Sequence, residues 1–234
     1  MTPWYVGYDV AQASDFSAVS VIQTTLEPPY YRLRHLERLP RKTPYPEQVK
    51  MVVDLCDHIG RWYGSMPVLA VDFTGVGGGV YDMLRSSYSG QTKGITITGG
   101  LTPSVTDDGR IHRIPKIELI SRLRIALESG HLKIARSLPE AESFTDELSN
   151  FELKVNEGGH VTMAAAGQGH DDLVLSVSLS LWFAHERHSG WGEQFVNPLV
   201  SKSPRPGNIP PMTFSFGHRK IPTLPVSNRR HGFM

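Results

Sequence analysis

Acidic side chains occur at three places in the sequence where apolar runs begin or end. Asp9 lies within an alternating apolar run, Asp72 ends a second run before a glycine-rich turn, and Asp171 and Asp172 precede the apolar segment 173–184. An unpaired carboxylate is costly to bury beside such segments, and converging carboxylates repel one another unless a cation lies among them. Oxygen ligands with few histidines favour Mg²⁺ or Mn²⁺ over Zn²⁺. The pattern therefore predicts a divalent-metal site, in which two ions could support phosphodiester hydrolysis.

Each of these carboxylates also has an interpretation that involves no metal. Asp72 could cap the turn that follows it, and Asp171 or Asp172 could cap the start of a helix. For any one residue, capping is the simpler explanation. For the whole set we prefer the metal site, because neighbouring strand ends converge and a terminal helix that crosses the sheet would bring Asp172 to Asp9 and Asp72.

The predicted elements alternate between strands and helices in a way that suits this convergence. Alternating and β-branched residues predict three strands, at 4–10, 18–22 and 31–39, joined by short turns into an antiparallel meander. Apolar periodicity and glycine turns predict a helix at 46–62, a strand at 67–72, a helix after the turn at 75–79, a strand at 94–98, a helix at 115–129 and a hairpin with its turn at 156–159. The segment 99–113 is predicted to be a long loop.

Two further segments have less clear patterns. In 173–184, Ser176, Ser178 and Ser180 alternate with apolar residues, which favours a strand, but the length and the acidic start favour a buried helix, which we predict. Residues 191–234 contain seven prolines, and residues 196–234 carry six Lys or Arg and no Asp or Glu. We therefore predict a folded domain over residues 1–190 and an extended, basic, proline-rich tail over residues 191–234.

The composition bounds the class of protein. Of 234 residues, 39% are hydrophobic and 20% are charged, which suits a buried core and argues against disorder throughout. Cys56 is the only cysteine, which excludes a disulfide scaffold and a cysteine-built zinc site. No stretch approaches the ~18 consecutive apolar residues of a membrane span, so no membrane partner is expected. The net charge of +1 hides an acidic body and a basic tail, and it gives no argument for nucleic-acid binding.

Four motifs together resemble a known protein family. They are residues 5–11 with Asp15 six positions after Asp9, residues 71–77, residues 114–116 at the start of a helix, and residues 169–172 before an apolar helix. In this order and at these separations they resemble the C-terminal nuclease domain of the terminase large subunit of tailed bacteriophages, over residues 4–188. The resemblance implies an α/β ribonuclease-H-like fold, in which three antiparallel strands and then parallel strands form a mixed sheet flanked by helices.

The resemblance also implies a function and its residues. It implies an endonuclease that uses two Mg²⁺ or Mn²⁺ ions to cut concatemeric double-stranded DNA during genome packaging, in the host-cell cytoplasm. The implied partners are a terminase ATPase motor, the small terminase subunit and the portal. Residue by residue, Asp9, Asp72 and Asp172 match the catalytic, metal-binding carboxylates, and Asp171 and Asp15 match auxiliary acidic positions.

Other residues are candidates for contact with DNA. Arg110, Arg113 and Lys116 lie in and after the predicted loop, where they could hold phosphates without reading bases or be solvated surface charges. His170 could touch a metal-bound water or the scissile phosphate, or simply pack in a turn. The sequence has no G-x-x-x-x-G-K-[ST] motif, so we expect an excised domain or a separately encoded subunit that neither hydrolyses ATP nor translocates DNA alone.

Two other classes of protein remain open. The glycine-rich turn after Asp72 also resembles that of a nucleotide- or methyl-donor-binding α/β enzyme, but the next strand ends in Thr98-Gly99-Gly100 rather than in the usual carboxylate. The chain could also be a non-catalytic packaging module that docks through its tail. The acidic set argues against both classes, because neither requires it.

Overall fold

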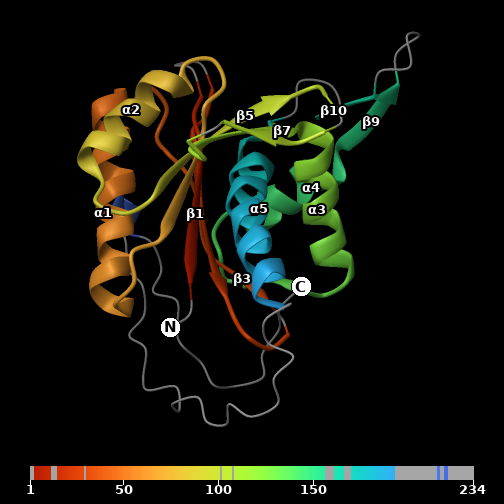
Figure 1. Cartoon of the computed structure of the whole chain (residues 1–234), viewed down its shortest axis with the longest axis horizontal. Helices are drawn as coiled ribbons and strands as arrows, with labels where there is room; N and C mark the ends of the chain where they lie inside the picture. The colour runs from red at the N-terminus through yellow and green to blue at the C-terminus, as the bar shows by residue number, and fades with distance from the viewer. Residues whose placement is uncertain are drawn as a thin grey trace.

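A computed structural model of the chain shows an eight-stranded mixed sheet with helices on both faces (Figure 1). It describes residues 3–11, 15–28, 30–100, 102–106, 108–155, 161–165, 170–192, 215–216 and 219–220. The sheet contains β1 (Trp4–Asp9), β2 (Ala18–Thr24), β3 (Tyr31–Arg38), β4 (Val68–Asp72), β5 (Thr92–Thr98), β6 (Ser104–Val105), β7 (Ile111–Pro115) and β8 (Leu132–Ile134). The helices are α1 (Tyr45–Tyr63), α2 (Gly77–Ser87), α3 (Lys116–Glu128), α4 (Ala141–Ser149) and α5 (Asp172–Gly192). Among the residues described, no helix combines the length and the apolar character needed to span a membrane.

The order of the strands places the ends of β1 and β4 side by side. Across the sheet the order is β6-β7-β5-β4-β1-β2-β3-β8. Strands β1, β2 and β3 form an antiparallel meander, whereas β4 is parallel to β1, β5 to β4 and β7 to β5. Because β1, β4, β5 and β7 run in the same direction, their carboxyl ends all lie along one edge of the sheet. Two two-stranded hairpins, β9 (Phe151–Val155) with β10 (Val161–Ala165) and β11 (Ser215–Phe216) with β12 (Arg219–Lys220), lie outside this sheet.

Each face of the sheet has its own apolar core (Figure 1). Helices α1 and α2 cover one face, where they pack against Val6, Tyr8 and Val71. Helices α3, α4 and α5 cover the other face, where they pack against Tyr5 and Ala70. Since side chains of a strand alternate between faces, odd-numbered residues of β1 point toward α5, and so do even-numbered residues of β4.

Helix α5 lies close to the sheet because β1 has a glycine where the two meet. A Cβ atom at Gly7 would lie 2.0 Å from the backbone oxygen of Ser176 and 2.8 Å from the backbone nitrogen of Ser180. Ser20 Oγ, on β2, donates a hydrogen bond to the Ser176 carbonyl at 2.8 Å. Ser178 Oγ donates to the Val174 carbonyl within α5 at 2.7 Å. The alternating serines are therefore hydrogen-bonded inside the buried part of α5, residues 172–184, which explains a helix where alternation favoured a strand.

The predicted meander, the mixed sheet and the helix at 173–184 are confirmed. The prediction of a long loop at 99–113 is wrong in part, because β6 and the first three residues of β7 lie within it. Strand β7 reads Ile-His-Arg-Ile-Pro, which has little strand pattern of its own and is stabilised by pairing with β5. Strand β8 and helix α4 were not predicted. The hairpin strands β9 and β10 are confirmed, whereas its turn at 156–159 and most of the tail lie outside the described residues, so the boundary after residue 190 stays a prediction.

Candidate metal centre

Asp9 and Asp72 are neighbours at the carboxyl ends of two parallel strands. Tyr8 on β1 pairs with Val71 on β4, so Asp9 and Asp72 follow in register with Cα atoms about 5 Å apart. Asp9 is two residues beyond Gly7 and therefore shares the face of the sheet that α5 covers. Only 7% of the Asp9 surface and 8% of the Asp72 surface are exposed. The sheet thus buries two carboxyl groups side by side, facing the last helix.

The start of α5 completes the acidic group. Asp172 is the first residue of α5 and is buried, and Asp171 directly precedes it. Burial raises the pKa of the Asp9 carboxyl well above its ordinary value, and the charges of Asp72, Asp171 and Asp172 raise it further. Burial also raises the pKa of Asp72, although that carboxyl accepts a hydrogen bond from the Thr74 backbone N–H at 2.8 Å. The charges of Asp72, Asp171 and Asp172 therefore act on the Asp9 carboxyl across the end of the sheet.

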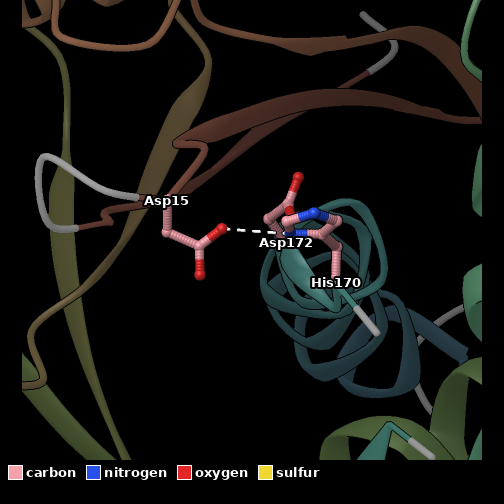
Figure 2. A group of neighbouring side chains, drawn as sticks. All are labelled: Asp15, His170 and Asp172. Carbon is pink, nitrogen blue, oxygen red and sulfur yellow. Dashed lines mark hydrogen bonds and ion pairs between the residues drawn. The ribbon is translucent and has the colours of Figure 1, made fainter. Parts of the chain in front are cut away.

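Possible ligand atoms of three residues gather at the start of α5 (Figure 2). One such atom from each of Asp15, His170 and Asp172 lies within 4.8 Å of the other two. His170 Nδ1 is 3.1 Å from Asp15 Oδ1 and 3.7 Å from Asp172 Oδ1. Asp172 Oδ1 is buried, and no residue in the described part of the chain gives it a hydrogen bond. A buried carboxylate oxygen without a donor is a position where a cation would be stabilised.

Arg38 and Glu147 hold Asp172 in its orientation. Arg38 ends β3 and donates from Nε to Asp172 Oδ2 at 2.6 Å, and its Nη2 pairs with Glu147. Glu147 Oε2, from α4, accepts hydrogen bonds at 3.1 Å from the backbone N–H groups of Leu173 and Val174, which caps α5. Burial and the charge of Asp172 raise the pKa of Glu147 to about 7. With Oδ2 taken by Arg38, Asp172 presents Oδ1 to the site.

Lys116 brings a positive charge to the acidic group. Its Nζ donates to Asp171 Oδ2 at 2.6 Å, and its charge lowers the pKa of both Asp9 and Asp72. Lys116 begins α3 directly after β7, whose carboxyl end lies at the same edge of the sheet as those of β1 and β4. The parallel strands therefore deliver a cation and two carboxyl groups to one place.

The structure brings the predicted acidic residues Asp9, Asp72, Asp171 and Asp172 within electrostatic reach of one another. Among the described residues, the group whose possible ligand atoms lie within 4.8 Å of one another is Asp15, His170 and Asp172, without Asp9 or Asp72. Lys116, predicted to contact DNA, is paired with Asp171. Arg110 and Arg113 are exposed, and among the described residues neither contacts the acidic group. Arg113 lies within β7 rather than in a loop, and contact of either arginine with DNA stays a prediction.

Arg38 and Glu147 were not predicted from the sequence. Arg38 has a weak signal, since it lies one residue before the end of the third predicted strand. Glu147 has none, because α4 was not predicted and only the fold brings it to the start of α5.

The glycines after Asp72 serve the turn from β4 into α2. A Cβ atom at Gly77 would lie 1.9 Å from the Asp72 carbonyl oxygen, and Gly75 has a φ of 59°. Close approach and a left-handed backbone each require glycine. The glycine-rich pattern is thus explained by the geometry of the chain without a bound cofactor.

Comparison with known proteins finds two similar terminase large subunits. No protein-family model matches the chain. The chain is 27% identical over 197 residues to the terminase large subunit of Thermus phage G20c, a match that covers 84% of this chain and 35% of that relative. The terminase large subunit of Thermus virus P23-45 gives the same identity and coverage. The chain therefore spans about a third of the length of the curated relatives it matches.

Solved structures show the same relationship. The large terminase nuclease of phage G20c with bound cobalt is 24% identical, with a TM-score of 0.56 over 77% of this chain and 81% of that one. Its magnesium-bound form gives a TM-score of 0.55. The human cytomegalovirus terminase nuclease domain is 10% identical, with a TM-score of 0.52 over 80% of this chain and 85% of that one. The ribonuclease-H-like fold and the resemblance to terminase nuclease domains are confirmed.

Proposed function

We propose that this chain is a divalent-metal-dependent endonuclease that hydrolyses double-stranded DNA during the packaging of a phage genome. The proposal is carried by the meeting of Asp9 and Asp72 with the start of α5 at one edge of the sheet. Buried carboxyl groups that raise one another's pKa oppose folding, so a purely structural domain gains nothing from them. The likeness to terminase nuclease domains supports this interpretation.

The donor atoms suit hard divalent cations. Carboxylate oxygens are the ligands that Mg²⁺ and Mn²⁺ prefer, and Asp172 Oδ1 is a buried oxygen that lacks a donor among the described residues. We assign two ions to Asp9, Asp72 and Asp172, with Asp171 and Asp15 as auxiliary ligands. When bound, such ions would polarise the scissile phosphate, activate a water molecule and stabilise the leaving oxygen.

The protein's own residues would prepare the site. Arg38 binds Asp172 and Glu147 caps the first turn of α5, so the start of this helix is held in place before any ion arrives. Lys116 offsets the repulsion within the acidic group through its ion pair with Asp171, and its ammonium could also donate to a DNA phosphate. These residues contribute positioning and charge rather than a covalent step.

The wider packaging role is inferred from longer relatives. The matched terminase large subunits extend well beyond the region that this chain covers. We propose that the nuclease acts with an ATPase motor, a small terminase subunit and a portal, in the host-cell cytoplasm, and that residues 191–234 form a tail separate from the nuclease domain of residues 1–190.

Cleavage of supercoiled plasmid tests the proposal, because a closed circle has no ends and only an endonuclease can nick or linearise it. In Mn²⁺ we expect the wild-type protein to produce nicked and linear plasmid, and EDTA to stop the reaction. Asp72→Asn should lower the rate at least about 100-fold, because charge stabilisation of the transition state is lost. Asp54→Asn, on the exposed side of α1, is the matched control and should cleave at the wild-type rate. Full activity in Asp72→Asn would overturn the assignment.

A further inference from the structure

A pocket of about 170 Å³ lies beside the candidate metal centre. The turn between β3 and α1 forms one wall, which carries Arg41 and Lys42. Asp15 lines the other side, and the same carboxylate lies 3.1 Å from His170 Nδ1. The pocket therefore shares a residue with the group of possible metal ligands, and a molecule held there would reach the metal centre.

The two cationic side chains of this pocket have no acidic partner among the described residues. Arg41 and Lys42 are exposed, and within the described ranges neither forms an ion pair. By contrast, Arg38 is paired with Asp172 and Glu147. Because surface cations without partners attract anions, the pocket favours an anionic ligand.

Phe16 orients Arg41 and connects it to the metal centre. The Arg41 guanidinium carbon lies 4.0 Å from the centre of the Phe16 ring, a stacking that holds the guanidinium in place. The edge of the same ring meets His170, with ring centroids 5.6 Å apart. Arg41 is therefore within about 10 Å of His170, a span of only a few phosphates, since each strand of DNA carries one phosphate per ~3.4 Å of axis.

Hydrogen bonds from α1 and within the turn hold the segment that carries these cations. Gln48 Nε2 donates to the Thr43 carbonyl at 2.7 Å, and the Tyr8 hydroxyl donates to Gln48 Oε1 at 2.7 Å. Thr43 Oγ1 donates to the Pro40 carbonyl at 2.7 Å. Lys42 has a φ of 65°, a left-handed conformation that lysine rarely adopts. The turn thus presents its two cations on a fixed framework.

We propose that Arg41 and Lys42 bind the phosphate backbone of double-stranded DNA next to the position of cleavage, and so position the substrate over the metal centre. The inference rests on the proposed function, since it takes DNA as the substrate. Contacts with phosphates carry no base information, so binding here is independent of sequence and weakens with salt. It adds to the interface two residues that lie outside the motifs shared with terminase nucleases.

Binding of a fluorescent DNA duplex in EDTA measures these contacts without cleavage. Each lost phosphate contact lowers the slope of log affinity against log salt by ~0.9, so Arg41→Gln/Lys42→Gln should lower it by about 2. The control variant Arg61→Gln/Lys133→Gln removes the same amount of charge elsewhere, since Arg61 lies in the last turn of α1 and Lys133 lies on β8. It should leave the slope of log affinity against log salt unchanged. Lys42→Gly relieves the left-handed strain, so it should keep or raise the melting temperature while it weakens binding.

Plasmid cleavage in Mn²⁺ supplies the second measurement. The Arg41→Gln/Lys42→Gln variant should show a raised KM with kcat near the wild-type value, as expected when ground-state contacts are lost. If the wild type cleaves DNA and this variant binds with the wild-type slope, the inference is overturned and the nuclease proposal stands. If the variant loses affinity but the wild type cannot cleave, the phosphate contacts of Arg41 and Lys42 stand, whereas their positioning role and the nuclease proposal fail. A wild type that binds no duplex would also overturn the inference.

Discussion

Replacing Gly7 by alanine tests whether the seating of α5 controls the metal centre. The added Cβ would lie 2.0 Å from Ser176 O and 2.8 Å from Ser180 N, and Cβ contacts below 3.0 Å are essentially never seen. Both atoms belong to the backbone of α5, so no side-chain rotation relieves the overlap. The helix must therefore move by about 1 Å away from β1, and Asp172, at its start, moves with it.

Two measurable losses should follow from that shift. Overpacking of a buried contact costs about 1–3 kcal/mol, which for a domain of this size lowers the melting temperature by roughly 2–12 °C. A displacement of about 1 Å at a reacting centre can cost ~100-fold in rate, so plasmid cleavage in Mn²⁺ should fall by up to that factor. Mn²⁺ affinity, measured by calorimetry, should fall with it, because Asp172 moves away from Asp9 and Asp72.

Two further variants separate packing from geometry. Gly79→Ala places its Cβ in open space within α2 and should leave cleavage unchanged, with a gain in stability of up to about 1 kcal/mol. Ser20→Ala removes the hydrogen bond to Ser176 O without adding volume, so it should cost about 1 kcal/mol in stability but keep Mn²⁺ affinity. If Gly7→Ala melts and binds Mn²⁺ like the wild type, α5 is not seated on β1 in the way described.

Three other outcomes can be measured on the same preparation. The pKa of Glu147 is about 7 in the fold against an ordinary 4.5, so the folded protein binds this proton more tightly than the unfolded chain does. The Glu147 carboxyl therefore makes the free energy of unfolding fall as the pH rises from about 4.5 to 7. Urea titrations of Glu147→Gln should be flatter over that window, and an identical profile would contradict the raised pKa. Burial and like charges disfavour ionised Asp9, so Asp9→Asn should raise the melting temperature of the metal-free protein at pH 8. The same change should abolish the increase in melting temperature that Mn²⁺ gives the wild type, and an undiminished increase would remove Asp9 from the ligand set. His170→Ala removes an imidazole nitrogen, a ligand that suits Mn²⁺ better than Mg²⁺. The cleavage rate in Mn²⁺ divided by the rate in Mg²⁺ should therefore fall, and a constant ratio would show that His170 binds no ion.

The acidic part of the site could be predicted from sequence because it depends on local rules. Asp9 and Asp72 end apolar strands, and parallel neighbours in a sheet place their carboxyl ends together. Asp172 precedes a run too apolar to lie anywhere but across the sheet. Spacing along the chain and the direction of the strands were therefore enough to predict the convergence.

The partners of those carboxyl groups could not be predicted, because they depend on contacts between distant segments. Arg38 reaches Asp172 across 134 positions of sequence. Glu147 lies on the buried face of the short helix α4, beside Ala141 and Phe144, and the helical spacing of these residues was not recognised. Strand β7 was missed for a similar reason, since pairing with β5 rather than its own residues makes it a strand. Local patterns indicate which residues end an element, but packing decides what meets them there.

The arrangement of cations around the acidic group indicates how the fold tolerates it. Lys116 approaches from the end of β7, on one side of the strand pair that carries Asp9 and Asp72, and Arg38 approaches from β3, on the other. Arg38 pairs with Asp172 at the start of α5, and Lys116 pairs with Asp171 directly before it. Among the described residues, neither cation forms a hydrogen bond to Asp9. Asp9 is thus left without a direct counterion among the described residues, and burial raises its pKa, so the metal-free fold disfavours its charged form. A divalent cation would relieve this cost directly, so ion binding and folding should reinforce each other.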